Sequence, residues 1–117
     1  MTISSDFPDI ANRRIASNGI ELNIAEQGDA GAPLIVMLHG FPESWFSWRH
    51  QFAPLSAAGY HVVAPDMRGY GQSDKPSDIS AYNQVEVVND VKGLVAALGY
   101  DTAIVIGHDW GGPTAWS

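Results

Sequence analysis

The residues with the most distinctive chemistry lie near the end of the sequence, in the run GHDWGG at 107–112. A β-branched run precedes it and a helix is expected after it, so Asp109 stands where a strand turns sharply into a helix. Glycines on both sides let such a turn be tight, and the strained turn directs the central side chain into the space above the sheet. This is the arrangement of a nucleophile elbow, in which the central residue attacks the substrate.

The residue at the elbow decides the chemistry, and in this sequence it is Asp109 rather than serine. A carboxylate attacks a saturated carbon by displacement and becomes an alkyl ester, so it suits epoxides and alkyl halides and is poorly suited to acyl transfer. Water then hydrolyses the ester through a tetrahedral intermediate whose oxyanion needs N–H donors. The helix that follows directs its positive end toward the same point.

Two backbone N–H groups are candidates for this oxyanion hole. One belongs to Trp110, directly after the nucleophile. The second is expected from the loop after the first parallel strand, HGFPE at 39–43, where Gly40 allows a close backbone approach and Phe41 carries the N–H. Pro42 cannot donate, and it stiffens the turn. The two motifs stand about seventy residues apart with two βα units between them, which strengthens the pairing of loop and elbow.

Extended runs and helical periodicity alternate along the chain and supply the elements that must position these loops. Asn18-Gly19 is a hairpin turn signal, and valines three or four apart between 85 and 95 mark the buried stripe of an amphipathic helix. The pattern predicts a hairpin of 13–16 and 20–26, buried strands at 34–38, 61–64 and 103–106, helices at 48–58 and 85–98, and the first turn of a further helix at 113–117.

Buried strands that alternate with helices indicate a parallel sheet with right-handed crossovers, here preceded by the hairpin. Ligands of such sheets bind at the carboxyl ends of the strands. Three loops leave those ends, at 39–45, 66–73 and 107–112, and they carry nearly all the unusual residues of the chain. The sequence therefore predicts an α/β domain whose site is assembled from these three loops.

Composition argues against several other classes of function. The 117 residues make one domain at most, and 45% of them are hydrophobic, which is enough for a core. The net charge is −7 and the six basic residues never cluster, so nucleic-acid binding is not expected. Without cysteines there are no disulfides, zinc–thiolate sites or cysteine nucleophiles. Neither a signal peptide nor a membrane-spanning run stands out, so a soluble cytoplasmic protein without a membrane partner is the default expectation.

Structural roles compete with chemical ones at several positions. Asp109 would also serve as a helix N-cap. His39 and His108 could join Asp66 or Asp109 in a metal site, but no pair has the i, i+4 spacing of a ligand motif, so no metal is expected. The remaining histidines are expected to be plain surface or edge residues: His50 and His61.

The other loop residues have two readings as well. Arg68 could hold an anionic substrate, although pairing with a carboxylate such as Asp66 or Asp74 is favoured. Trp45 could equally line the substrate cavity or belong to the core. For Trp48, at the predicted start of a helix, the core is favoured.

Three blocks together resemble the signature motifs of a known family. HGFPESW at 39–45, DMRGYGQS at 66–73 and GHDWGG at 107–112 look like those of the epoxide-hydrolase branch of the α/β-hydrolase superfamily, and the similarity spans 20–117. The resemblance implies an α/β-hydrolase fold and the hydrolysis of a small hydrophobic epoxide to a vicinal diol through an ester on Asp109. It implies no metal and no organic cofactor.

The resemblance also implies roles for individual residues. Asp109 is implied as the nucleophile, and the backbones of Phe41 and Trp110 as the oxyanion hole. Contacts with the substrate are implied for Trp45, Trp110 and Phe41. The residues that keep the motifs in shape are His39, Gly40, Pro42, Gly107, His108 and Gly111.

Two positions distinguish the related branches that share the aspartate. Haloalkane dehalogenases keep a tryptophan after the nucleophile but commonly carry Asn or Glu where this chain has Phe41. Fluoroacetate dehalogenases resemble the HGFP loop but follow the nucleophile with arginine, where this chain has Trp110. The combination of Phe41 and Trp110 fits epoxide hydrolases best, with a haloalkane dehalogenase as the alternative.

The resemblance implies that residues 1–117 are the N-terminal part of a single core domain, without the lid and the C-terminal half. In the family a pair of lid tyrosines protonates the epoxide oxygen, and a late acid and a late histidine activate the water. We therefore expect no turnover from this chain alone, and an open edge on its third parallel strand, which is central in the family. The alternative from another class is a non-catalytic fragment or scaffold that binds a hydrophobic small molecule or a partner chain.

Overall fold

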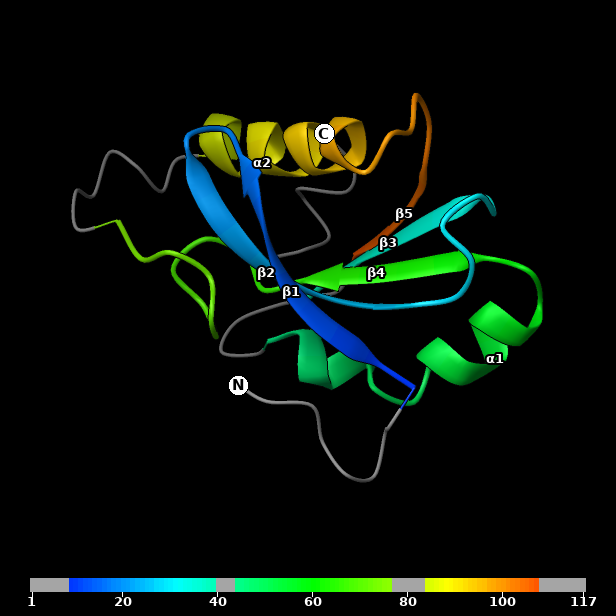
Figure 1. The fold of residues 1–117 in the computed structure, drawn as a ribbon. Helices are drawn as coiled ribbons and strands as arrows, with labels where there is room; N and C mark the ends of the chain where they lie inside the picture. Colours follow the sequence, from blue (N-terminus) through cyan, green and yellow to red (C-terminus); the bar gives the residue numbers. More distant parts are fainter. Residues whose placement is uncertain (1–8, 40–43, 77–83, 108–117) are drawn as a thin grey trace.

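One mixed sheet of five strands organises the chain (Figure 1). The computed structural model describes residues 9–39, 44–76 and 84–107. The strands are β1 (Ala11–Ser17), β2 (Ile20–Gln27), β3 (Leu34–Leu38), β4 (His61–Pro65) and β5 (Ile104–Gly107), and the helical elements are the 3₁₀ turn η1 (Trp45–Trp48), α1 (Phe52–Ala57) and α2 (Gln84–Ala97).

The strands lie in the order β1-β2-β4-β3-β5. β1 and β2 form an antiparallel hairpin, β2 continues antiparallel to β4, and β3 runs parallel to β4 on one side and to β5 on the other. This confirms the predicted hairpin followed by a parallel βαβαβ unit. The predicted strand 34–38 matches β3 residue for residue.

The hairpin turn has the backbone that its sequence predicts. Asn18 and Gly19 have φ of 51° and 80°, and a two-residue turn that follows the strand twist needs positive φ at both positions. The end of the hairpin also holds α2. Ser17 Oγ donates to the carbonyl of Asp90 at 2.6 Å, and Asn18 Nδ2 donates to Asp90 Oδ1 at 3.1 Å. The turn therefore fixes a helix that comes about seventy residues later in the chain.

Alternate residues of the central strands supply two separate cores. On β3, Ile35 and Met37 face η1 and α1, whereas Leu34, Val36 and Leu38 face α2, as the two-residue period of a strand requires. One core contains Ile10, Ala25, Ile35, Met37, Trp45, Phe52, Val62 and Ala64, and the other contains Leu22, Ile24, Leu34, Val36, Leu38, Val63 and Leu94.

The two crossover connections cover opposite faces of the sheet. In Figure 1, α2 lies above the sheet, and η1 and α1 lie below it. The reason is the strand order: the chain moves from β3 to β4 in one direction and then back past β3 to β5, and connections of one hand then alternate between the faces. A crevice is expected between the carboxyl ends of β3 and β5, where the strand order reverses.

The first helix is shorter than predicted. The sequence favours one helix over 48–58, whereas the chain forms η1 and then α1. Pro54 explains the difference because it has no N–H and its ring clashes with the carbonyl four residues earlier in a helix interior, so it fits only in a first turn. α1 accordingly begins at Phe52 and ends before Gly59, whose φ is +99°.

The second helix is where the sequence places it, but one of the predicted core valines is not buried. Leu94 is fully buried, and Val91 and Val95 pack against the same core. Val85, by contrast, is 68% exposed, so its place in the buried stripe was wrong. It stands nine residues before Leu94, which at 3.6 residues per turn is the opposite side of the helix.

β5 pairs with the rest of the sheet along one side only. Its register with β3 runs from Ile35↔Ile104 to Leu38↔Gly107, and no described strand lies beyond it. Among the described residues, β5 is therefore the last strand on this side of the sheet. The prediction that the run 103–106 is buried was wrong here, because Ile104 is 50% exposed and Ile106 is 37% exposed.

His61, predicted as a surface or edge residue, is buried. It opens β4, which lies between β2 and β3, and its backbone pairs with Leu34. Its ring contacts Glu26 Oε1 at 2.9 Å through Nε2 and Tyr100 Oη at 3.1 Å through Nδ1. Because His61 begins the strand that Pro65 ends, this polar group lies at the opposite edge of the sheet from the loops predicted to carry the chemistry.

Two glycines with similar backbones give a test of the packing between β2 and β4. Gly28 has φ +105°, and a Cβ there would lie 2.2 Å from the carbonyl oxygen of Tyr60, whereas Gly59 has φ +99° and nothing within 4 Å. We expect Gly59→Ala to lower the free energy of unfolding by ~1–2 kcal/mol. We expect Gly28→Ala to lower it by a further ~1–3 kcal/mol because of the clash.

Urea unfolding of this chain, followed by tryptophan fluorescence, measures both glycine variants. Equal losses at Gly28 and Gly59 would contradict the close approach of the Tyr60 carbonyl.

Candidate active site

The carboxyl ends of the three parallel strands meet at one edge of the sheet. β3 and β5 end as register partners, Leu38 opposite Gly107, and β4 is parallel to β3 on its other side. The loops that begin at 39, 66 and 108 therefore leave the same edge, as predicted. Several predicted site residues lie outside the described residues: Gly40, Phe41, Pro42, His108, Asp109, Trp110 and Gly111.

His39, the first residue after β3, is buried and joins two of these loops. Its Nε2 accepts a hydrogen bond from the N–H of Met67 at 2.9 Å. Its ring also meets the ring of Tyr70 edge to face, with the centroids 5.0 Å apart. These contacts support the structural role predicted for His39, because the Nε2 lone pair faces an N–H group.

Asp66 is a buried carboxylate at this edge of the sheet. The residue is only 1% exposed, and its side chain accepts three N–H hydrogen bonds. Oδ1 accepts from the N–H of Trp45 at 2.8 Å, and Oδ2 accepts from Asn23 Nδ2 at 3.0 Å and from the N–H of Gln72 at 2.9 Å. The carboxylate thus ties together β2, the loop 39–45 and the loop 66–73.

The loop 66–73 folds around this carboxylate. Gly69 and Gly71 have φ of +85° and +52°, and a Cβ on Gly71 would lie 2.2 Å from Asp66 Oδ2, so only glycine leaves the carboxylate its place. Ser73 closes the loop: its hydroxyl donates to the carbonyl of Asp66 and accepts the N–H of Asn23 at 2.8 Å. The glycines and the serine of the motif therefore have a structural reason in this chain.

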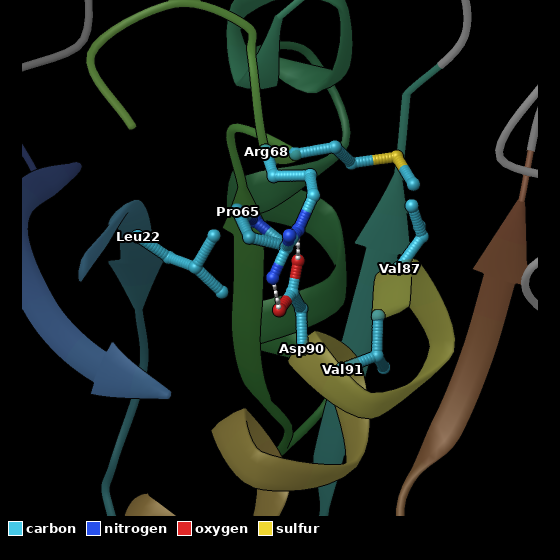
Figure 2. A pocket seen from close by; sticks show the side chains of 7 residues that line it. Leu22, Pro65, Arg68, Val87, Asp90 and Val91 are labelled. Carbon is cyan, nitrogen blue, oxygen red and sulfur yellow. Dashed lines mark hydrogen bonds and ion pairs between the residues drawn. The ribbon is translucent and has the colours of Figure 1, made fainter. Parts of the chain in front are cut away.

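Arg68 binds neither of the carboxylates that the sequence analysis favoured. Its Nε donates to Asp90 Oδ2 at 2.7 Å and its Nη2 donates to Asp90 Oδ1 at 2.8 Å, and both side chains are only 4% exposed (Figure 2). The predicted structural role stands, but the partner comes from α2. Asp66 is taken by N–H donors, and Asp74 pairs with Arg14 instead.

The small pocket beside this ion pair is part of the core. Figure 2 shows Arg68 and Asp90 meeting between the sheet and α2. The pocket has a free volume of about 10 Å³, the room of one water molecule at most. An organic substrate does not fit there. The lining residues are Leu22, Pro65, Met67, Arg68, Val87, Asp90 and Val91.

Trp45 lies in the core, which is one of the two roles left open for it. Its ring is fully buried and meets the rings of Phe46 and Phe52 edge to face, at 5.4 and 6.1 Å between centroids. Contact with a substrate would require these groups to move, so that role stays a prediction. Trp48 packs against the same core, which confirms the prediction for that residue.

An exposed ion pair closes the outer end of the loop. Asp74 accepts the N–H of Glu21 at 2.9 Å and pairs with Arg14. The hydrogen bond from the Glu21 N–H, followed by Arg14, lowers the pKa of Asp74, and the hydrogen bond to Glu21 raises the pKa of Arg14. These contacts hold the loop to the hairpin.

Two further findings concern only the part of the chain that the structure describes. Over residues 9–39, 44–76 and 84–107, no three His, Asp or Glu side chains come together as a metal site would need. Within the same ranges, no helix has both the length and the apolar character to cross a lipid bilayer.

Comparison with known proteins identifies the fold. A family model described as the α/β hydrolase fold matches residues 33–117. The chain belongs to the α/β-hydrolase family. The fold class predicted from the motifs is therefore confirmed, and the edge described above is where enzymes with open α/β sheets bind their ligands.

Relatives within the α/β-hydrolase family include several named epoxide hydrolases. Epoxide hydrolase A of Mycobacterium tuberculosis is 46% identical over 105 residues, which are 90% of this chain and 33% of that protein. The AB hydrolase superfamily protein YfhM of Bacillus subtilis is 51% identical over 102 residues, 87% of this chain and 36% of that protein. The chain spans about a third of the length of these relatives.

Solved structures agree. Epoxide hydrolase A from Mycobacterium thermoresistibile matches with a TM-score of 0.90 and 47% identity, over 92% of this chain and 34% of that one. Epoxide hydrolase VrEH1 from Vigna radiata matches with a TM-score of 0.90 and 43% identity, over 94% of this chain and 35% of that one. The resemblance to epoxide hydrolases that the motifs indicated is confirmed.

Sequence reasoning missed two residues that hold the site edge together. Asp90 had a visible signal, since it interrupts the apolar stripe of α2 between Val87 and Leu94, where a charge needs a buried partner. Asn23 had none, because a polar residue between Leu22 and Ile24 on a strand looks like an ordinary outward-facing position.

The Arg68–Asp90 pair can be tested by removing one partner. Arg68→Met leaves an uncompensated carboxylate in the core, so we expect the free energy of unfolding to fall by about 3–5 kcal/mol. The double variant with Asp90→Leu should recover most of that loss. Urea unfolding measures both variants.

Arg14→Met is the matched control for this pair, because its ion pairs are exposed, and it should cost much less stability. If the double variant were as unstable as Arg68→Met alone, the loss of stability would not come from the unpaired carboxylate of Asp90.

Proposed function

We propose that the whole protein to which residues 1–117 belong hydrolyses a small hydrophobic epoxide to a vicinal diol through an ester on Asp109. One observation carries the proposal: an aspartate stands at the centre of the GHDWGG run, whose first residue, Gly107, ends β5. A carboxylate at an elbow directs the chemistry to displacement at carbon. The names of the relatives, several of them epoxide hydrolases, support the choice of substrate class.

The placement of β5 supports the proposed pairing of elbow and oxyanion loop. Gly107 is the register partner of Leu38, so Asp109 follows the end of one strand and Phe41 follows the end of its neighbour. The two segments therefore begin side by side. This is what an oxyanion hole needs, with one N–H from Trp110 after the nucleophile and one from Phe41.

In the proposed first step, a carboxylate oxygen of Asp109 attacks one carbon of the epoxide from the side opposite the ring oxygen. The carbon–oxygen bond of the ring breaks, and its electron pair goes to the ring oxygen, which takes a proton. The product is a hydroxyalkyl ester of Asp109.

In the second step, water attacks the carbonyl carbon of this ester and gives up a proton to a base. The tetrahedral oxyanion is stabilised by the N–H groups of Phe41 and Trp110. It collapses with loss of the diol, which takes that proton from the base, and Asp109 is left as a carboxylic acid. This acid gives up its proton, which replaces the one that the ring oxygen took in the first step, and the carboxylate of Asp109 is restored. Carbon, oxygen and hydrogen balance as one epoxide and one water forming one diol, so no cofactor is required.

The origin of the diol oxygen tests this route. In a single turnover of the whole protein in ¹⁸O-water, the heavy oxygen should enter the carboxylate of Asp109 and the diol should contain none. Later turnovers should release labelled diol, because the labelled carboxylate then attacks. Mass spectrometry of the diol measures both, and a labelled diol in the first turnover would mean that water attacks the epoxide directly.

Asp109→Asn provides the matching loss of function within the same experiment. Its initial rate, taken before any deamidation, should fall by on the order of 10⁴-fold or more, with no covalent ester. Asp101→Asn makes the same chemical change at an exposed position and should retain full activity. Release of halide from an alkyl chloride without diol from any epoxide would make the protein a dehalogenase instead.

We also propose that residues 1–117 alone sustain no turnover. The resemblance assigns the lid tyrosines, the late acid and the water-activating histidine to positions beyond 117. All four histidines of this sequence precede Asp109, and His61 lies at the far edge of the sheet. When the purified chain is incubated with styrene oxide, the rate of diol formation, measured by chiral chromatography, should equal the uncatalysed rate. Sustained diol production above that rate would refute this proposal.

A further inference from the structure

Two adjacent residues hold both ends of the segment in which Phe41 lies. The N–H of Met67 donates to Nε2 of His39, before that segment, at 2.9 Å. The carboxylate of Asp66 accepts the N–H of Trp45, after it, at 2.8 Å. The bond between Trp45 and Asp66 is buried and the bond between Met67 and His39 is half-buried, and both start from residues just after the end of β4, the neighbour of β3.

We propose that Asp66 is a positioning residue for the oxyanion hole. By holding the N–H of Trp45 it fixes the far end of the loop 39–45, and so sets where the N–H of Phe41 stands relative to the ester on Asp109. This inference rests on the proposed function and deepens it, because it names the group that keeps the oxyanion donor in place.

The surroundings of Asp66 fit positioning rather than direct participation in the chemistry. Its two oxygens accept from Trp45, Asn23 and Gln72, and a Cβ at Gly71 would lie 2.2 Å from Oδ2, so the backbone of Gly71 lies close to the carboxylate. A carboxylate with both oxygens occupied by N–H donors does not serve as a nucleophile or a base. Its carbonyl is fixed as well, by the hydroxyl of Ser73.

The two chemical steps depend differently on the hydrogen bond between Asp66 and the N–H of Trp45. Displacement at the epoxide carbon creates no oxyanion on the carbonyl of Asp109, whereas hydrolysis of the ester does. A loosened loop 39–45 should therefore slow the second step and spare the first. A change that merely reduced stability would not separate the two rates.

Asp66→Asn in the whole protein is the direct test. The amide can keep the two bonds to Oδ2 in one orientation, and it then turns its NH₂ toward the N–H of Trp45. We expect ester hydrolysis to slow by about 10–100-fold, somewhat less than the loss of a whole oxyanion donor, while alkylation changes little. The ester on Asp109 should accumulate, as seen by intact-mass spectrometry of samples quenched during rapid mixing.

Asp74→Asn is the matched control. Asp74 lies in the same stretch and also accepts a backbone N–H, but its partners are Glu21 and Arg14 of the hairpin. It should leave both rates unchanged. If Asp66→Asn does not fold, Gly71→Ala gives a second route, since the added Cβ would push the carboxylate from its place.

The outcomes separate the two proposals. If the unaltered protein forms no ester on Asp109, the proposed function fails. If the ester forms but folded Asp66→Asn and Gly71→Ala hydrolyse it at the normal rate, the function stands and the positioning role of Asp66 is overturned. Equal slowing of alkylation and hydrolysis would also overturn it, because it would indicate a general loss of structure.

Discussion

The buried carboxylate of Asp66 is the constraint on which the site edge depends. A charge with 1% exposure is tolerated only when hydrogen-bond donors replace water, and here the donors come from three separate segments: the side chain of Asn23 on β2, the N–H of Trp45 and the N–H of Gln72. Strand, loop and turn must therefore all be in place at once. Because Asp66 needs these N–H donors, one residue just after β4 connects three segments of the fold.

The next two residues along the chain connect further segments. Met67 reaches His39 after β3, and Arg68 reaches Asp90 on α2, so three consecutive residues bind three different elements. Asp90 in turn receives the tip of the hairpin through Asn18. A second polar group, formed by His61 and Glu26, lies at the other edge of the sheet. β3 and β4 are thus apolar between their ends, and their polar partners lie at or just beyond those ends.

This division of roles explains how one family supports different reactions. The sheet and its buried contacts place the ends of β3 and β5 side by side whatever residue follows them. The reaction then depends on the side chain at the elbow and on the donors around it. With serine at that position the fold would support acyl transfer, whereas aspartate supports displacement at a saturated carbon. In this architecture the loop residues decide the reaction, and the strands fix the positions from which the loops start.

Local signals in the sequence predict the elements and the proposed chemistry, because each depends on neighbours along the chain. The Asn18-Gly19 turn, the apolar run of β3 and the aspartate in the GHDWGG run are of this kind. Pro54 also carried a local signal, and it shortened α1 against the helical spacing around it. Only the tertiary structure decided the partners of the buried charges, namely Asp90 for Arg68 and three N–H donors for Asp66. It also decided that His61 is buried and that Ile104 is half exposed. These depend on strand order and on contacts between distant segments, for which residue spacing contains no information.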